Sequence, residues 1–167
     1  LSVTTQGAGA VTWNGDVALT AAAAGTNLFV SAASLSFAAD VDASTVDRDV
    51  ELYVDGLWLA ANNTISAGTA NLTIAPRTSA FSVEFAPTNE AGLVTDVYID
   101  SDFANITAGN FSLGRATHSG TIHVGNSLGA VDANGYDLSV VTTGAIFVRN
   151  DYLASTGNKD LTLDCGA

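Results

Sequence analysis

The feature that most constrains the fold is a pair of apolar residues, two positions apart, that recurs along the chain. Apolar residues at alternate positions are typical of a β-strand, because successive side chains point to opposite faces. Five of the seven intervals between successive copies are 20 to 25 residues long, which is the length of one β-solenoid coil. The eight pairs are Val17/Leu19, Leu28/Val30, Leu52/Val54, Leu72/Ile74, Val97/Ile99, Ile122/Val124, Leu138/Val140 and Leu161/Leu163.

Most intervals also contain a second short strand, as in "LSFAA", "LWLAA", "FSVEF" and "IFVRN". The sequence therefore predicts an all-β parallel β-helix with coils of about 20–25 residues, formed as a single segment over residues 1–167. An antiparallel sandwich is the competing prediction. It is less favoured because the hairpin dipeptide Asn-Gly occurs only at 14–15 and 134–135. Coil length is expected to vary around residues 91–120.

Composition excludes several classes of partner. The chain is 47% apolar and carries a formal net charge of −12, which fits a folded, soluble domain. Its five Lys and Arg residues are scattered singly, so neither nucleic acid nor a membrane is an expected partner. Cys165 is predicted to point inward as a small buried residue. The start at Leu1 and the lack of methionine suggest a processed product or an excised segment.

Four stretches resemble the passenger repeats of filamentous haemagglutinin-like adhesins, which are exoproteins of two-partner secretion. They are "ANLTIAP", "ITAGNFSLGRATHSGTIHVGN", "YDLSVVTTGAIFVRN" and "STGNKDLTLDCGA". The resemblance covers residues 60–167 well and 1–59 loosely. It implies a β-helix at the cell surface with an adhesive or scaffold role. The Asn-Pro-Asn elements of that family's export domain are missing, so the resemblance implies an interior piece of a fibre.

Acidic side chains give one candidate cation site. Two carboxylates two positions apart share one side of a strand or loop, so such pairs could hold calcium or act as a glycosidase acid and base. Asp40, Asp42, Asp47 and Asp49 are the best candidates, although solvated corners are the favoured interpretation. His118 and His123 are expected on opposite faces and do not predict a metal site. No cofactor is predicted, with calcium left open.

Aromatic residues give a candidate binding surface. Between the apolar members of each pair stands one outward residue, and in several copies it is a ring: Phe29, Tyr53 and Tyr98. Trp58 points outward in the same register. These four residues are predicted to form a ladder that contacts another protein or stacks on sugar rings. In the alternative prediction, a loop of the chain covers these aromatic residues. Sequons for N-glycosylation in a glycosylating host stand at Asn62, Asn71, Asn105 and Asn110.

The chain is thus expected to be a structural or adhesive segment of an extracellular β-helical fibre and not an enzyme. Its expected partners are neighbouring coils or further copies of itself, together with host-surface or matrix glycans and proteins. "LTLDCGA" supplies no polar cap, so its strand edge is expected to be covered by another coil. A glycan-binding module and a polysaccharide-degrading β-helix are the alternatives.

Overall fold

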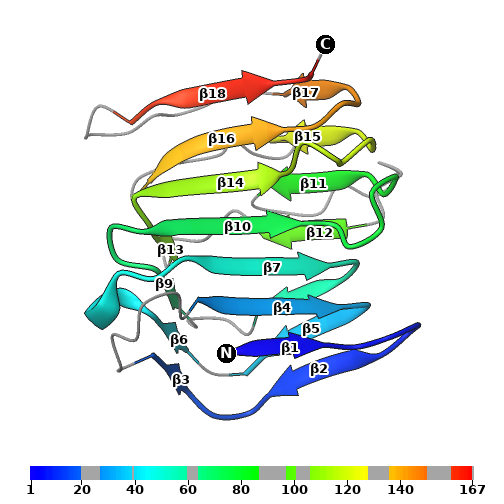
Figure 1. Ribbon diagram of the computed structural model, residues 1–167. Helices are drawn as coiled ribbons and strands as arrows, with labels where there is room; N and C mark the ends of the chain where they lie inside the picture. The colour runs from blue at the N-terminus through cyan, green and yellow to red at the C-terminus, as the bar shows by residue number, and fades with distance from the viewer. Residues whose placement is uncertain are drawn as a thin grey trace.

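A computed structural model describes residues 1–19, 27–38, 40–59, 64–86, 97–100, 106–127, 136–149 and 159–166 (Figure 1). In these ranges the chain forms short β-strands and one 3-10 helix, η1 (Ser44–Val46). Every pairing between the described strands is parallel. The predicted parallel β-solenoid is therefore confirmed, and the antiparallel sandwich is excluded. No helix in these ranges has the length and apolarity needed to cross a lipid bilayer.

The largest sheet contains seven strands stacked one above the other, and Figure 1 shows them facing the viewer. Their polar and apolar residues alternate, so one face is buried and the other is open. From bottom to top the strands of this seven-stranded sheet are β1 (Ser2–Thr4), β4 (Leu28–Ala32), β7 (Val50–Val54), β10 (Asn71–Ala75), β14 (Asn110–Gly114), β16 (Asp137–Val141) and β18 (Leu161–Asp164).

Three smaller sheets complete the coils. A three-stranded sheet holds β2 (Ala10–Trp13), β5 (Ser34–Phe37) and β8 (Leu57–Leu59). A four-stranded back sheet holds β12 (Val97–Asp100), β11 (Val83–Ala86), β15 (Ile122–Val124) and β17 (Ile146–Val148). A four-stranded side sheet holds β13 (Ile106–Thr107), β9 (Ile65–Ser66), β6 (Val41–Asp42) and β3 (Val17–Ala18).

The core consists of columns in which residues of successive coils stack inside the solenoid. Strand register defines two columns under the seven-stranded sheet. The first contains Leu28, Val50, Leu72, Phe111, Leu138 and Leu161, and the second contains Val3, Val30, Leu52, Ile74, Leu113, Val140 and Leu163. The first members of the predicted pairs, Leu28, Leu52, Leu72 and Leu161, were expected to form one inner stack. Leu28, Leu72 and Leu161 do so, but Leu52 lies one column away and Val50 takes its place.

The eight predicted apolar pairs were aligned as copies of one strand, but several of them belong to sheets other than the seven-stranded sheet. Val17 lies in the side sheet, and Val97/Ile99 and Ile122/Val124 lie in the back sheet. Conversely, Phe111 and Leu113 of β14 occupy the inner columns although the template missed them. The interval from Leu72 to Phe111 is 39 residues, against 22 from Leu28 to Val50 and from Val50 to Leu72. This is the region where irregular coil length was expected.

The long interval contains an exchange of strand order. Strand β11 precedes β12 in sequence, yet β12 lies beside β8 and β11 lies farther up, between β12 and β15. Figure 1 shows β12 at the level of β10 and β11 at the level of β14. The chain therefore steps up from β10 to β11, returns to β12 and then continues through β13 to β14. In the first coils, β2 and β5 lie at the same level as β1 and β4, the strands that precede them. After the exchange, β15 and β17 lie one level above β14 and β16, the strands that precede them.

Candidate functional site

The corners of the coils carry most of the described hydrogen bonds made by carboxylates. Six described aspartates accept a bond from a backbone N–H one coil later. Asp47 accepts from Thr69 at 2.8 Å, Asp55 from Thr78 at 2.6 Å and Asp40 from Thr64 at 2.7 Å. Asp16, Asp49 and Asp137 do the same for Asp40, Asn71 and Asp160. These acidic side chains therefore link one coil to the next.

All four residues of the candidate cation site are used in such corners. Asp40, Asp47 and Asp49 each accept a hydrogen bond from the following coil. Asp42 instead accepts from the hydroxyl and the N–H of Ser44, at 2.5 and 2.9 Å, and these bonds lower the pKa of its carboxyl below the usual value. Among the described residues no group of three or more His, Cys, Asp or Glu side chains is placed to hold a metal ion. Calcium binding stays a prediction.

Two of the four predicted ladder residues meet on the outer face of the seven-stranded sheet. The rings of Phe29 and Tyr53 contact each other edge to face, with centroids 5.4 Å apart. The Tyr53 hydroxyl donates to Glu51 at 3.0 Å, and the Arg115 guanidinium lies 4.6 Å from the Tyr53 ring centroid. Burial, with help from Glu51, raises the pKa of the Tyr53 phenol. We call Phe29, Glu51, Tyr53 and Arg115 the aromatic patch.

The other two ladder residues lie elsewhere in the fold. Trp58 belongs to β8, opposite Ser36, and Tyr98 belongs to β12, opposite Glu84. The side chains of both lie outside the described part of the structure. Because β8 and β12 do not belong to the seven-stranded sheet, the four residues do not form one ladder. The sequence template could not separate these strands, since both sides of each coil show the same alternation.

A second cluster, which the sequence did not predict, lies on the back sheet. Glu84 and His123 are register neighbours on β11 and β15, and the Asn126 amide donates to the Glu84 carboxylate at 2.5 Å. The His123 ring stacks on Phe147, with centroids 5.2 Å apart. Glu84 stands at an outward register position between Val83 and Phe85, yet it is 0% exposed. The alternation of the sequence gives the direction of a side chain but not whether other chain segments cover it.

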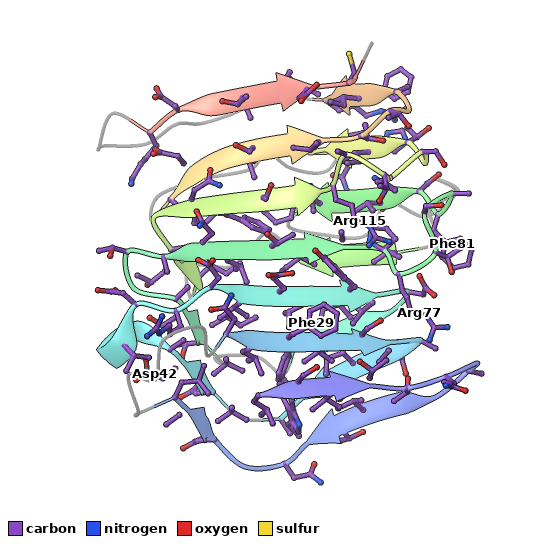
Figure 2. All side chains as sticks on the ribbon, viewed as in Figure 1. Phe29, Asp42, Arg77, Phe81 and Arg115 are labelled. Atoms are coloured by element: carbon purple, nitrogen blue, oxygen red, sulfur yellow. The ribbon has the colours of Figure 1, made fainter. Side chains whose placement is uncertain are left out.

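Two of the five cations gather at one corner, although the sequence shows them 38 positions apart. Arg77 reaches Asp55 at 3.5 Å and donates to the carbonyl of Gly7 at 2.6 Å. Arg115 donates to the carbonyls of Pro76 and Arg77 at 3.3 and 3.1 Å. Figure 2 shows both guanidinium groups beyond the ends of the central strands of the seven-stranded sheet. These two arginines thus join separate coils.

His118 and His123 serve different parts of the structure. His118 lies in the turn after β14, is 0% exposed and has its Nε2 2.7 Å from the carbonyl oxygen of Phe81. Burial lowers the pKa of the His118 imidazole. His123 lies on β15 in the cluster with Glu84. The two rings therefore belong to a corner and to the outside of the back sheet, respectively.

The structure describes Cys165 and two of the four sequon asparagines, Asn71 and Asn110. Asn71 and Asn110 are the first residues of β10 and β14, two central strands of the seven-stranded sheet, where Asn71 Nδ2 donates to Asp49 and Asn110 Oδ1 accepts from Ser139. Asn62 and Asn105 lie outside the described residues. Cys165 is exposed, which contradicts the prediction that it is buried. It follows β18, the edge strand, so no described strand covers it.

Comparison of the chain with protein-family models, with characterised proteins and with solved structures returned no match. The fold and the placement of the described residues therefore carry the functional argument.

Proposed function

We propose that this chain is a structural, non-enzymatic segment of an extracellular β-helical fibre that projects from a cell surface. The observation that carries the proposal is the use of the corner aspartates. Asp40, Asp47 and Asp55 each bond a backbone N–H of the next coil, beside core columns that continue from coil to coil. A solenoid stabilised mainly by contacts between neighbouring coils forms a rod that can be lengthened by adding coils.

The resemblance to filamentous haemagglutinin-like passenger repeats supports the same proposal. Its stretches "ANLTIAP" and "YDLSVVTTGAIFVRN" coincide with β10 and with β16 and β17, which are stacked parallel strands. The solenoid fold is what that resemblance implies. Secretion, surface location and adhesion come to this chain as parts of the proposal.

Immunoelectron microscopy of the source material tests the proposed function. Antibodies raised against residues 1–167 should label thin rods that extend from the cell surface. A rod is the expected shape because stacked strands add about 4.8 Å of length per coil. Label confined to the cell interior, or to compact particles without rods, would contradict the proposal.

A second candidate function is glycan binding by the aromatic patch. Two rings in contact, a carboxylate and a guanidinium stand together on a face whose neighbouring outward residues in the same strand register are Thr73, Ser112 and Ser139. Sugar sites commonly pair an aromatic surface with polar hydrogen-bonding groups. This arrangement favours a saccharide over an apolar ligand.

A glycan array with matched variants tests this second candidate. Phe29→Ala and Tyr53→Ala should each weaken binding roughly fivefold, because an aromatic contact contributes about 1 kcal/mol. Thr73→Ala lies on the same face outside the patch and should bind as the parent does. Equal binding by all three variants would reject the patch, and Trp58→Ala then tests the ring of β8.

A further inference from the structure

The side chain of Arg115 lies across the outer face of the seven-stranded sheet. Gly114, the last residue of β14, has a φ of 84°, and a Cβ at this position would overlap the carbonyl oxygen of Val141. The register pairs Ala75 of β10 with Tyr53 of β7 and places Gly114 next in the same outer column. Ala75 is small, so the Arg115 side chain can cross β10 and reach the Tyr53 ring.

Neutral groups hold the Arg115 guanidinium in place. Its Nη2 donates to the carbonyls of Pro76 and Arg77, and its Cζ lies 4.6 Å from the centroid of the Tyr53 ring. Within the described part of the chain no carboxylate forms an ion pair with Arg115, and its Nε is buried without a hydrogen-bond partner. A half-buried positive charge is thus fixed in position without a counter-charge.

The other cation of this corner already has a carboxylate partner. Arg77 lies 3.5 Å from Asp55 and donates to the carbonyls of Thr5 and Gly7 at 3.4 and 2.6 Å. Charged side chains removed from water are generally paired. The chain has 17 Asp and Glu residues against five Lys and Arg residues, yet none of the described carboxylates pairs with Arg115. Its guanidinium is therefore suited to the carboxylate of a ligand.

The groups beside Arg115 fit a sugar ring. Phe29 and Tyr53 meet edge to face, with centroids 5.4 Å apart, and both are half-buried. Glu51, which accepts a hydrogen bond from the Tyr53 hydroxyl, and Thr73 are register neighbours in one outer column. Aromatic rings can stack on the apolar face of a sugar, and the carboxylate and the hydroxyl can bind its hydroxyl groups. Arg115 adds a positive charge to this set.

We propose that the aromatic patch binds saccharides that carry a carboxylate, and that Arg115 pairs with this carboxylate. The inference rests on the second candidate function, glycan binding by the patch, and names its ligand class. A guanidinium binds a carboxylate through charge-assisted hydrogen bonds, which are roughly twice as strong as neutral ones. Uronic acids are the ligand class, because they carry a carboxylate directly on a sugar ring.

The net charge of the chain opposes an acidic ligand only at long range. The formal charge is −12, which repels anions at low ionic strength. Near physiological ionic strength the Debye length is about 8 Å, so more distant exposed charges are largely screened. A contact within hydrogen-bond distance of Arg115 is screened much less. This contact therefore decides the preference between an acidic and a neutral sugar.

Isothermal titration calorimetry with trigalacturonic acid and its methyl ester tests the ligand class. The two saccharides have the same rings, but the ester is uncharged. At physiological ionic strength the parent protein should bind the acid at least about tenfold more tightly than the ester. Equal affinities, tighter binding of the ester or no binding of the acid would overturn the proposal. Ester binding that Tyr53→Ala weakens would still support glycan binding, so the two failures are distinguishable.

Matched variants test the role of Arg115. Arg115→Gln removes the charge but keeps N–H donors, and should reduce the preference for the acid to less than about threefold. Arg77→Gln removes the same charge at the same corner, where Asp55 already pairs with it, and should leave the preference unchanged. Arg115→Lys keeps the charge without the planar guanidinium and should give an intermediate preference.

Circular dichroism and the thermal midpoint show whether each variant is folded. A folded Arg115→Gln protein that keeps the full preference for the acid overturns the role of Arg115. An equal loss of preference in Arg77→Gln does the same, because the effect would then follow from the charge of the corner. If Arg115→Gln does not fold, the Arg115→Lys variant decides: an unchanged preference would show that the guanidinium does not select the carboxylate.

Discussion

The Asp47 carboxylate accepts a hydrogen bond of 2.8 Å from the backbone N–H of Thr69, which lies 22 residues later in the chain and one coil higher. Asp47 ends the 3-10 helix in the left-handed region, with φ of 46°. Aspartate tolerates this conformation better than most residues and supplies an acceptor at the same time. One residue thus both turns its own coil and bonds the next.

Replacing Asp47 should show how much a corner bond contributes. Asp47→Ala removes the acceptor and places alanine at positive φ, so we expect the free energy of unfolding to fall by about 1–2 kcal/mol. Asp47→Asn keeps an acceptor oxygen and tolerance of positive φ, and should lose less than half of that. Urea unfolding of the two variants measures the difference. Equal losses would show that the acceptor is not what the corner requires.

Phe111 should be the most costly truncation among the inward residues of the seven-stranded sheet. It is 0% exposed and contacts the rings of Phe85 and Tyr136 edge to face, with centroids 5.5 and 5.2 Å apart. Phe111→Ala should lower the free energy of unfolding by about 3–5 kcal/mol. Phe147→Ala removes a ring that is 48% exposed and should cost less than about 1 kcal/mol. A smaller loss at Phe111 than at Phe147 would contradict the assignment of the core.

At Gly120 the backbones of two neighbouring coils lie close together, and substitution tests this contact. A Cβ at this position would overlap the backbone carbonyl of Phe81, which cannot move away as a side chain could. We expect Gly120→Ala to lower the thermal midpoint strongly, with a loss above about 2 kcal/mol. At Gly15 an added Cβ meets nothing within 4 Å, so Gly15→Ala should change stability by less than about 0.5 kcal/mol. Similar midpoints for the two variants would contradict the close coil contact.

The buried His118 should make stability depend on pH. Burial lowers the pKa of His118 in the folded state, so below the ordinary value of about 6.5 the unfolded chain binds a proton that the folded chain does not. Stability should therefore fall as the pH decreases from about 7.5 to about 5. His118→Gln removes the titrating group, and its urea midpoint should change less over that range. An equal change in both proteins would show that His118 does not contribute.

The strands and the solenoid could be predicted because alternation and repeat length are local properties of the sequence. Their alignment was less accessible. Val50, Leu52 and Val54 are three inward residues of one strand, so an apolar pair can be placed there in two ways. The predicted pair was Leu52/Val54, whereas the strand register aligns Val50/Leu52 with Leu28/Val30. The exchange of β11 and β12 depends on which distant edge each strand meets, which no local pattern records.

The candidate site was predicted in part. Outward direction was correct for Phe29 and Tyr53, whose rings do meet, because both lie on strands of one sheet. Asp40, Asp47 and Asp49 each accept a backbone N–H of the following coil, a use that the sequence did not indicate. The cluster of Glu84, His123 and Asn126 was missed because its burial comes from neighbours that are remote in sequence.

Distances between spin labels on one outer column test the stacking most directly. Ser2, Ser112 and Thr162 occupy the same register column on β1, β14 and β18. With Cys165→Ala as the background, and with labelled chains diluted in an excess of unlabelled chains so that only distances within one chain are measured, a Ser2→Cys/Thr162→Cys pair spans six strand spacings. It should measure about 29 Å between backbones, against about 19 Å for Ser2→Cys/Ser112→Cys. Two distances that differ by about 10 Å in this order are the predicted result. Equal distances, or a shorter one for Thr162, would contradict the stacked solenoid.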